Sequence, residues 1–205
     1  IVERDTAGFG ISKPLEKMGV HAVPVTELHF QDVRVPAGCL LGEENGGFKV
    51  IMANLNALRP VVAARGLGTA EGALAYALDY GKQRETFGKP IVQHQAIQFM
   101  LAELAMQAEA ARLLTYKAAW LVDQGRHLDR DAVPHLSIAK AVATELAVKA
   151  TGDAMQIMGG AGYMAEFPME RYYRDAKQLT IVEGTSQVQR MIVGRALLEG
   201  NLSYW

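Results

Sequence analysis

The stretch Gln93–Asp123 reads QHQAIQFMLAELAMQAEAARLLTYKAAWLVD and forms one unbroken helical pattern. Apolar or small side chains recur in it every three or four residues, at Ile97, Leu101, Leu104, Ala108, Ala111 and Thr115. That spacing places them on one stripe of an α-helix, and Gly125 supplies a stop signal just beyond the stretch. The pattern therefore predicts a long helix whose stripe must be buried against other helices.

Further helices are expected on both sides of this stretch. They are predicted at about residues 46–59, 60–82, 131–158, 168–180 and 186–198. Pro60 fits the first turn of a helix, because its missing N–H has no partner there in any case. The glycines between 159 and 162 are expected to end the preceding helix after Met158. Long helices with short connections predict a mainly α chain that forms an up-and-down four-helix bundle.

Residues 1–41 have a different pattern, which favours strands and turns. The stretch Val23–Val35 is rich in β-branched and apolar residues, and Leu28 and Phe30 alternate with polar neighbours. The alternation changes parity at Asp32, which predicts a bulge or bend there. The sequence thus divides into a few strands over residues 1–41 and a helical bundle over residues 42–205.

Composition excludes several classes of protein. The 205 residues are 50% hydrophobic and carry a net charge of −1, so neither disorder nor bulk nucleic-acid binding is expected. The single cysteine, Cys39, cannot form an internal disulfide, and no Cys or His residues have metal-ligand spacing. No membrane span is visible. Because the sequence starts at Ile1 and residues 1–8 read as the middle of a domain, we expect the native N-terminus to lie outside it.

Glu183 is the first candidate for chemistry on local features. It follows the apolar pair Ile181 and Val182, precedes Gly184, and stands just before a helix that Thr185 or Ser186 would cap. Apolar neighbours disfavour the charged form of a carboxylate, which suits a general base. The alternative is an ordinary carboxylate that the helix dipole favours at a helix start.

Two further groups could hold a ligand. Arg84 and Thr86, at a helix end before Gly88, combine a guanidinium with a hydroxyl, as a phosphate site requires. The alternative is an ordinary charged helix terminus. Gln156 precedes Gly159 and Gly160, which allow a backbone to approach a ligand closely, although the same glycines could simply end a helix.

Taken together, these segments resemble the C-terminal half of the acyl-CoA dehydrogenases. The matching blocks occur in the order of that family and cover essentially the whole sequence. They are FQDVRVP at 30–36, GGFK at 46–49, RETFG at 84–88, HQAIQ at 94–98, QIMGG at 156–160, RDAK at 174–177 and EGTSQ at 183–187.

The resemblance implies a flavoenzyme with an N-terminal helical domain, a middle β-domain and a C-terminal four-helix bundle. Residues 1–41 would be the last strands of the middle domain and residues 42–205 the bundle. We expect this chain alone to be inactive, because the rest of the flavin and acyl pockets would lie outside it. The resemblance also implies a homo-oligomer, a dimer of dimers, with an electron-transfer flavoprotein as acceptor, in a bacterial cytoplasm or a mitochondrial matrix.

The resemblance also implies roles for single residues. Glu183 matches the catalytic base, and Gly184, Asn56 and Arg59 match contacts to the acyl-CoA substrate. Val182 stands where many members have Tyr, and Asn56 where some have Asp. The positions that match FAD contacts are Arg84, Thr86, His94, Gln95, Gln156, Gly159, Gly160, Thr185 and Gln187.

The implied reaction is the α,β-dehydrogenation of an acyl-CoA thioester to a trans-2-enoyl-CoA, with the β-hydride passing to FAD. Two alternatives stay open. One is a related oxidase, which would pass the electrons to O₂. The other is a helical interaction module without catalysis, against which the joint presence of Glu183, Arg84, Gln156 and Gln187 argues.

Overall fold

The chain is mainly α-helical, as a computed structural model that describes residues 1–202 establishes. Helices make up 62% of it, which confirms the predicted fold class. Contacts within the chain divide it into two units, Ile1–Asn54 and the part from Leu55 onward, and the helix α1, Gly47–Gln83, contains the boundary.

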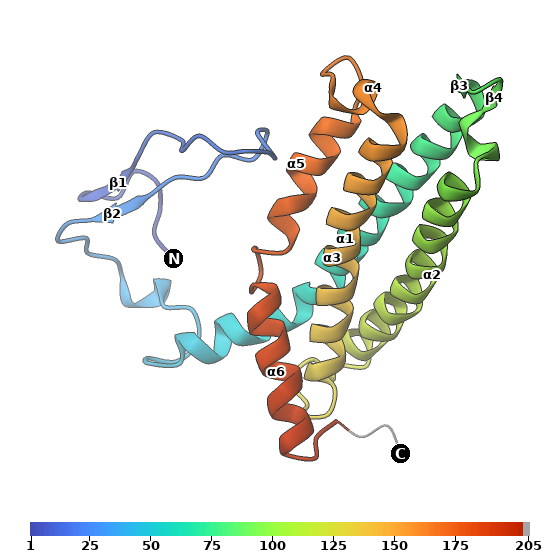
Figure 1. Cartoon of the computed structure of the whole chain (residues 1–205). Helices are drawn as coiled ribbons and strands as arrows, with labels where there is room; N and C mark the ends of the chain where they lie inside the picture. The colour runs from blue at the N-terminus through green and yellow to red at the C-terminus, as the bar shows by residue number, and fades with distance from the viewer. Residues whose placement is uncertain (203–205) are drawn as a thin grey trace. The chain divides into compact units, whose positions relative to one another are not determined.

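Six helices make up most of the structure (Figure 1). In the second unit α1, α2 and α3 run side by side, and α5 and α6 follow one another as the fourth column of the bundle (Figure 1). The predicted helix at 186–198 is confirmed to the residue. The helices are α1 Gly47–Gln83, α2 Gln95–Asp123, α3 Val133–Met158, α4 Gly160–Tyr163, α5 Met169–Leu179 and α6 Ser186–Leu198.

The helix break expected at Pro60 is wrong, because α1 continues through it as one helix of 37 residues. A proline inside a helix removes one backbone hydrogen bond and crowds the preceding turn. Pro60 and its neighbour Arg59 are both buried, and the helix packs into the bundle core beyond them. Tertiary packing on both sides of the proline therefore outweighs the local cost.

The bundle core consists largely of alanine and leucine from α1, α2 and α3. Its α1 members include Ala63 and Leu67, which pack with Leu104 and Leu136 of the other two helices. A Cβ added to Gly66 would lie 2.7 Å from the carbonyl oxygen of Ala143. Small residues thus let the axes of α1 and α3 approach closely.

The first unit contains one antiparallel pair, β1 Phe9–Ile11 and β2 Leu28–Phe30, followed by a 3₁₀ turn at Ala37–Cys39. Within the predicted strand pattern over 23–35, residues 28–30 form the strand, and backbone hydrogen bonds continue the pairing at Val25, Glu27 and Gln31. Asp32 has φ of +51°, which confirms the predicted bend.

The predicted loop between the second and third helical patterns contains a two-residue hairpin, β3 Glu85–Thr86 with β4 Lys89–Pro90, and a 3₁₀ turn at Ile91–Gln93. Its turn residues Phe87 and Gly88 both have positive φ, as a type I′ turn requires.

Candidate active site and cofactor-binding residues

The segment between α5 and α6 holds Glu183 in an unusual backbone conformation. Glu183 has φ of +55° and Gly184 has φ of +90°, although residues other than glycine rarely adopt positive φ. The turn is closed by the Ser186 N–H, which donates to the carbonyl oxygen of Thr180 at 3.0 Å. Thr185 caps α6, because its hydroxyl oxygen accepts from the Val188 N–H at 3.3 Å. Surrounding contacts must therefore hold Glu183 in a strained geometry.

Two buried side chains supply those contacts. The side-chain amide of Gln189 donates to the carbonyl oxygens of Glu183, at 3.3 Å, and Gly184, at 3.0 Å. The ammonium of Lys140, on α3, donates to the same Gly184 oxygen at 2.8 Å. Both side chains are 0% exposed. A Cβ on Gly184 would lie 2.7 Å from the Gln189 nitrogen, so a larger residue there would push the Gln189 amide away and would be strained at φ of +90°.

Two cations lie buried in this region. Arg59, on α1, is 2% exposed, and its Nε and Nη1 find no hydrogen-bond partner among residues 1–202. Burial lowers the pKa of the Arg59 guanidinium to about 10. Burial also lowers the pKa of Lys140 to about 8, with the charge of Glu183 opposing the shift and that of Arg59 adding to it. Lys140 thus lies between the partly buried Glu183 and the buried Arg59, and it interacts electrostatically with both.

Asn56 lies one helical turn before Arg59 and is also buried. Its side-chain nitrogen donates to the carbonyl oxygen of His127 at 2.9 Å. Its side-chain oxygen has no hydrogen-bond partner within the described part of the chain. Residues three apart share one face of a helix. Asn56 and Arg59 therefore present unsatisfied polar groups from the same face of α1.

A second polar region lies where α1 and α3 end. Arg84, Thr86, Gly159 and Gly160 come from segments far apart in sequence, yet they line one hollow of about 400 Å³. His94 is positioned there by its ring nitrogen, which lies 3.2 Å from the hydroxyl oxygen of Thr86. A guanidinium, a hydroxyl and a glycine backbone without side chains are the groups that bind phosphates.

The other predicted residues lie near these two regions. Gln95 is the first residue of α2 and Gln156 lies in the last turn of α3, and both are exposed at the Arg84 end. Gln187 is exposed in the first turn of α6 and lines a hollow of about 300 Å³ with Thr185 and Glu145. The predicted break at 159–162 begins at Gly159, with φ of +61°, but residues 160–163 form the one-turn helix α4.

Sequence reasoning missed Lys140 and Gln189. A signal for Lys140 exists, because it stands on the buried stripe of α3 between Leu136 and Thr144. A lysine on such a stripe needs a partner to be buried.

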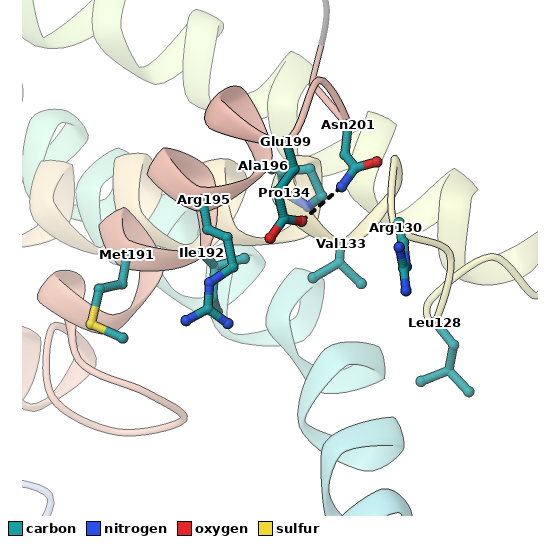
Figure 2. A pocket seen from close by; sticks show the side chains of 10 residues that line it. All are labelled: Leu128, Arg130, Val133, Pro134, Met191, Ile192, Arg195, Ala196, Glu199 and Asn201. Carbon is teal, nitrogen blue, oxygen red and sulfur yellow. Dashed lines mark hydrogen bonds between the residues drawn. The ribbon is translucent and has the colours of Figure 1, made fainter.

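A third hollow, of about 340 Å³, lies between the start of α3 and the end of α6. Figure 2 shows Arg130 and Arg195 on its wall, together with the hydrogen bond from Asn201 to Glu199 at 3.0 Å. None of the residues singled out from the sequence lines it.

Within residues 1–202, no helix has the length and hydropathy needed to cross a membrane. The same residues contain no cluster of three or more His, Cys, Asp or Glu side chains suited to a metal ion.

Comparison with known proteins identifies the class to which this fold and these residues belong. The family described as "Acyl-CoA dehydrogenase, C-terminal domain" matches residues 45–198. The chain is 50% identical over 198 residues to the short-chain specific acyl-CoA dehydrogenase of Megasphaera elsdenii, covering 97% of this chain and 51% of that protein. It is 48% identical over 200 residues to an acyl-CoA dehydrogenase of Bacillus subtilis (strain 168), covering 98% and 52%.

Solved structures agree with this. Butyryl-CoA dehydrogenase from Megasphaera elsdenii superposes with a TM-score of 0.91 at 49% identity, covering 96% of this chain and 50% of that one. A chain in the structure of the electron transferring flavoprotein of Acidaminococcus fermentans gives 0.91 at 46%, covering 96% and 51%. The structure of PigA with FAD and proline gives 0.90 at 28%, covering 96% and 50%.

The chain belongs to the acyl-CoA dehydrogenase family. It spans about half the length of the relatives named above.

Proposed function

We propose that this chain supplies the catalytic base and much of the FAD-binding surface of an enzyme that oxidises an acyl-CoA thioester to a trans-2-enoyl-CoA. The observation that carries the proposal is the loop at Glu183. Its carboxylate stands on a strained turn whose backbone carbonyls accept from two buried side chains, which matches the fixed position that a general base needs.

Glu183 removes the proton from the α-carbon of the thioester in this proposal. The α-proton is a weak acid, so the thioester carbonyl must be polarised as the proton leaves. Within the described residues the peptide N–H of Glu183 has no acceptor, so it is available to the thioester oxygen. When bound, FAD would supply the acceptor for the hydride that leaves the β-carbon.

Arg59 and Asn56 are assigned to the substrate side of the same site. Both are buried on one face of α1, and both keep polar atoms without partners among the described residues. Buried unsatisfied groups are costly, so a bound thioester and its amide groups would compensate them. Because the relative from Megasphaera elsdenii is short-chain specific, a short acyl-CoA is the first substrate to test.

The residues at the Arg84 end fit the diphosphate and adenosine of FAD. Arg84 and Thr86 offer a cation and a hydroxyl beside the open backbone of Gly159 and Gly160. His94 and Gln95 lie at the start of α2, and Gln156 lies in the last turn of α3. Thr185 and Gln187 are assigned to the flavin near Glu183. The structure of PigA with FAD, at 28% identity, supports this cofactor.

Two features support the proposed partners. A relative of this fold occurs in the structure of an electron transferring flavoprotein, which supports such a protein as the electron acceptor. The outer face of α2 carries a row of side chains seven residues apart, each at least half exposed: Phe99, Met106, Leu113 and Trp120. An apolar row of this kind on a helix is typical of a subunit interface and supports a homo-oligomer, with a dimer of dimers as the expected form.

Reduction of the flavin tests the function directly. A full-length enzyme that contains this chain should hold FAD, and butyryl-CoA should bleach the flavin absorbance within the dead time of manual mixing under anaerobic conditions. The reduced enzyme should then reoxidise slowly in air and quickly with an electron-transfer flavoprotein. Fast reoxidation by O₂ would favour the oxidase, and absence of flavin would favour the non-catalytic module.

A further inference from the structure

Lys140 is a buried cation with no direct part in the proton transfer proposed above. It lies in the middle of α3, its side chain is 0% exposed, and it is the largest of the fully buried side chains. A lysine ammonium is strongly hydrated in water, so burying it costs free energy unless it gains a specific partner. Its position therefore calls for a structural reason.

The partner is the backbone at the proposed base. The Lys140 ammonium donates to the carbonyl oxygen of Gly184 at 2.8 Å, and the amide of Gln189 donates to the same oxygen at 3.0 Å. That oxygen belongs to the peptide bond between Gly184 and Thr185, one residue beyond Glu183, and both Glu183 and Gly184 have positive φ. Two donors on one carbonyl fix the plane of the Gly184–Thr185 peptide, and the Gln189 amide also donates to the Glu183 carbonyl at 3.3 Å. The two peptides that follow Glu183 are therefore both held, which restricts the direction in which the Glu183 side chain leaves the backbone.

The charges around Lys140 agree with such a role. Glu183 from the loop and Glu145 from α3 favour its charged form, whereas Arg59 from α1 disfavours it. Burial has the largest effect and lowers the pKa of Lys140 to about 8. The ammonium is still the main form near neutral pH, and charged donors make the stronger hydrogen bonds.

We propose that Lys140 is a positioning residue for the base: its hydrogen bond to Gly184 holds the strained turn so that the Glu183 carboxylate and the Glu183 N–H face the thioester together. The inference rests on the proposed function. Loss of this hydrogen bond leaves the substrate and FAD contacts in place but lets the Glu183 carboxylate sample unproductive directions. A misplacement of about 1 Å costs up to about 10²-fold in rate.

The test compares Lys140→Met with two other variants in the full-length enzyme. Methionine has a similar length and no donor. Lys140→Gln keeps a donor without the charge, and Lys149→Met is the matched control, because Lys149 is on the same helix but exposed and paired with Asp153 at 2.6 Å. Flavin content, KM, the rate of flavin reduction by butyryl-CoA and the α-deuterium isotope effect are measured for each.

We expect Lys140→Met to keep its flavin and its KM within about twofold, while flavin reduction slows by at least about tenfold and the α-deuterium effect reaches its full value. Lys140→Gln should recover part of that loss, and Lys149→Met should match the wild type. Unchanged flavin reduction in Lys140→Met would overturn the inference. If that variant does not fold, Lys140→Leu, which also lacks a donor, takes its place, and a wild-type rate there overturns the inference.

Amide hydrogen exchange tests the hydrogen bond from Lys140 to Gly184 without any substrate. The amides of Ile181–Ser186 should exchange at least about tenfold faster in Lys140→Met than in the wild type, with a smaller increase in Lys140→Gln, and unchanged exchange in Lys140→Met would overturn the inference. If no acyl-CoA reduces the wild-type flavin but exchange still rises in the variants, the proposed function is wrong, whereas the role of Lys140 in holding the Glu183 turn is confirmed.

Discussion

The two polar regions of the bundle differ in how they are built. At Glu183 the groups that shape the site are buried inside the chain, and Lys140 and Gln189 are both 0% exposed. At Arg84 the groups are open to solvent, and Arg84, Gln95 and Gln156 are all exposed. One region is held in place by its own core, whereas the other is a surface that something else must cover.

This difference has a consequence for energetics. Buried donors on the carbonyl of Gly184 act in a low dielectric and hold a strained backbone continuously. Arg84, Gln95 and Gln156 are exposed instead, so little within the chain holds their side chains until a ligand or another part of the enzyme arrives. We therefore expect the Glu183 region to be preorganised and the Arg84 region to depend on its surroundings.

Expression of residues 1–205 alone gives the largest expected effect. The bundle core lies within the chain, so helicity by circular dichroism should be retained. The open Arg84 region should fail to retain FAD, with an affinity lower by orders of magnitude than in the full-length enzyme, and no acyl-CoA-dependent dye reduction should be seen. A helical, yellow and active 205-residue protein would contradict the dependence proposed for this region.

Glu183→Gln breaks the other side of the comparison. The amide keeps the size of the side chain but cannot accept a proton at neutral pH, so turnover in the full-length enzyme should fall by at least about 10²-fold with FAD still bound. Turnover within a few-fold of the wild type would remove Glu183 from its role as the base. Glu166→Gln, an exposed carboxylate ahead of α5, is the control and should change nothing.

Arg84→Ala measures how much the exposed region contributes. A charged hydrogen bond to a diphosphate is worth about 1.5–3 kcal/mol, so the Kd for FAD should rise by about tenfold or more. Titration of FAD into the apo-enzyme gives this value. Lys82→Ala is the control, because Lys82 is a neighbouring cation that pairs with Asp79 at the surface. An equal loss of FAD affinity in both variants would mean that the loss comes from the change in net charge and not from a contact made by Arg84.

The helices were predictable from the sequence because their apolar periodicity is local information. The helix at Ser186–Leu198 and the bend at Asp32 both match. Pro60 misled the prediction, since the packing that carries α1 through it depends on distant residues. The one-turn helix α4 was also missed, because its glycines resemble a simple break.

The candidate residues were named from family blocks, and the fold brings Arg84, Thr86, Gly159 and Gly160 to one hollow. Their roles stay predictions. Lys140 and Gln189 were not found, because nothing beside them in sequence reveals that both reach the carbonyl of Gly184. A buried polar side chain is identified by its partners, and those partners are set by tertiary structure.

The smallest expected effect concerns the dependence of stability on pH at Lys140. Burial lowers its pKa from 10.5 to about 8 in the folded chain, so between these values the unfolded chain binds more protons. The free energy of unfolding of the wild type relative to Lys140→Met should therefore rise with pH above about 8, because the cost of burying the charge is fully present below that value and is relieved above it. Allowing for partial solvation of the ammonium, we expect a change of about 1 kcal/mol between pH 7.5 and 9.5, measured by urea denaturation at both values. The exposed control Lys149→Met should show no such trend relative to the wild type. A decrease with pH in the free energy of unfolding of the wild type relative to Lys140→Met would mean that the folded chain stabilises the charged ammonium. Burial of Lys140 beside Glu183 would then cost less free energy than the structure indicates.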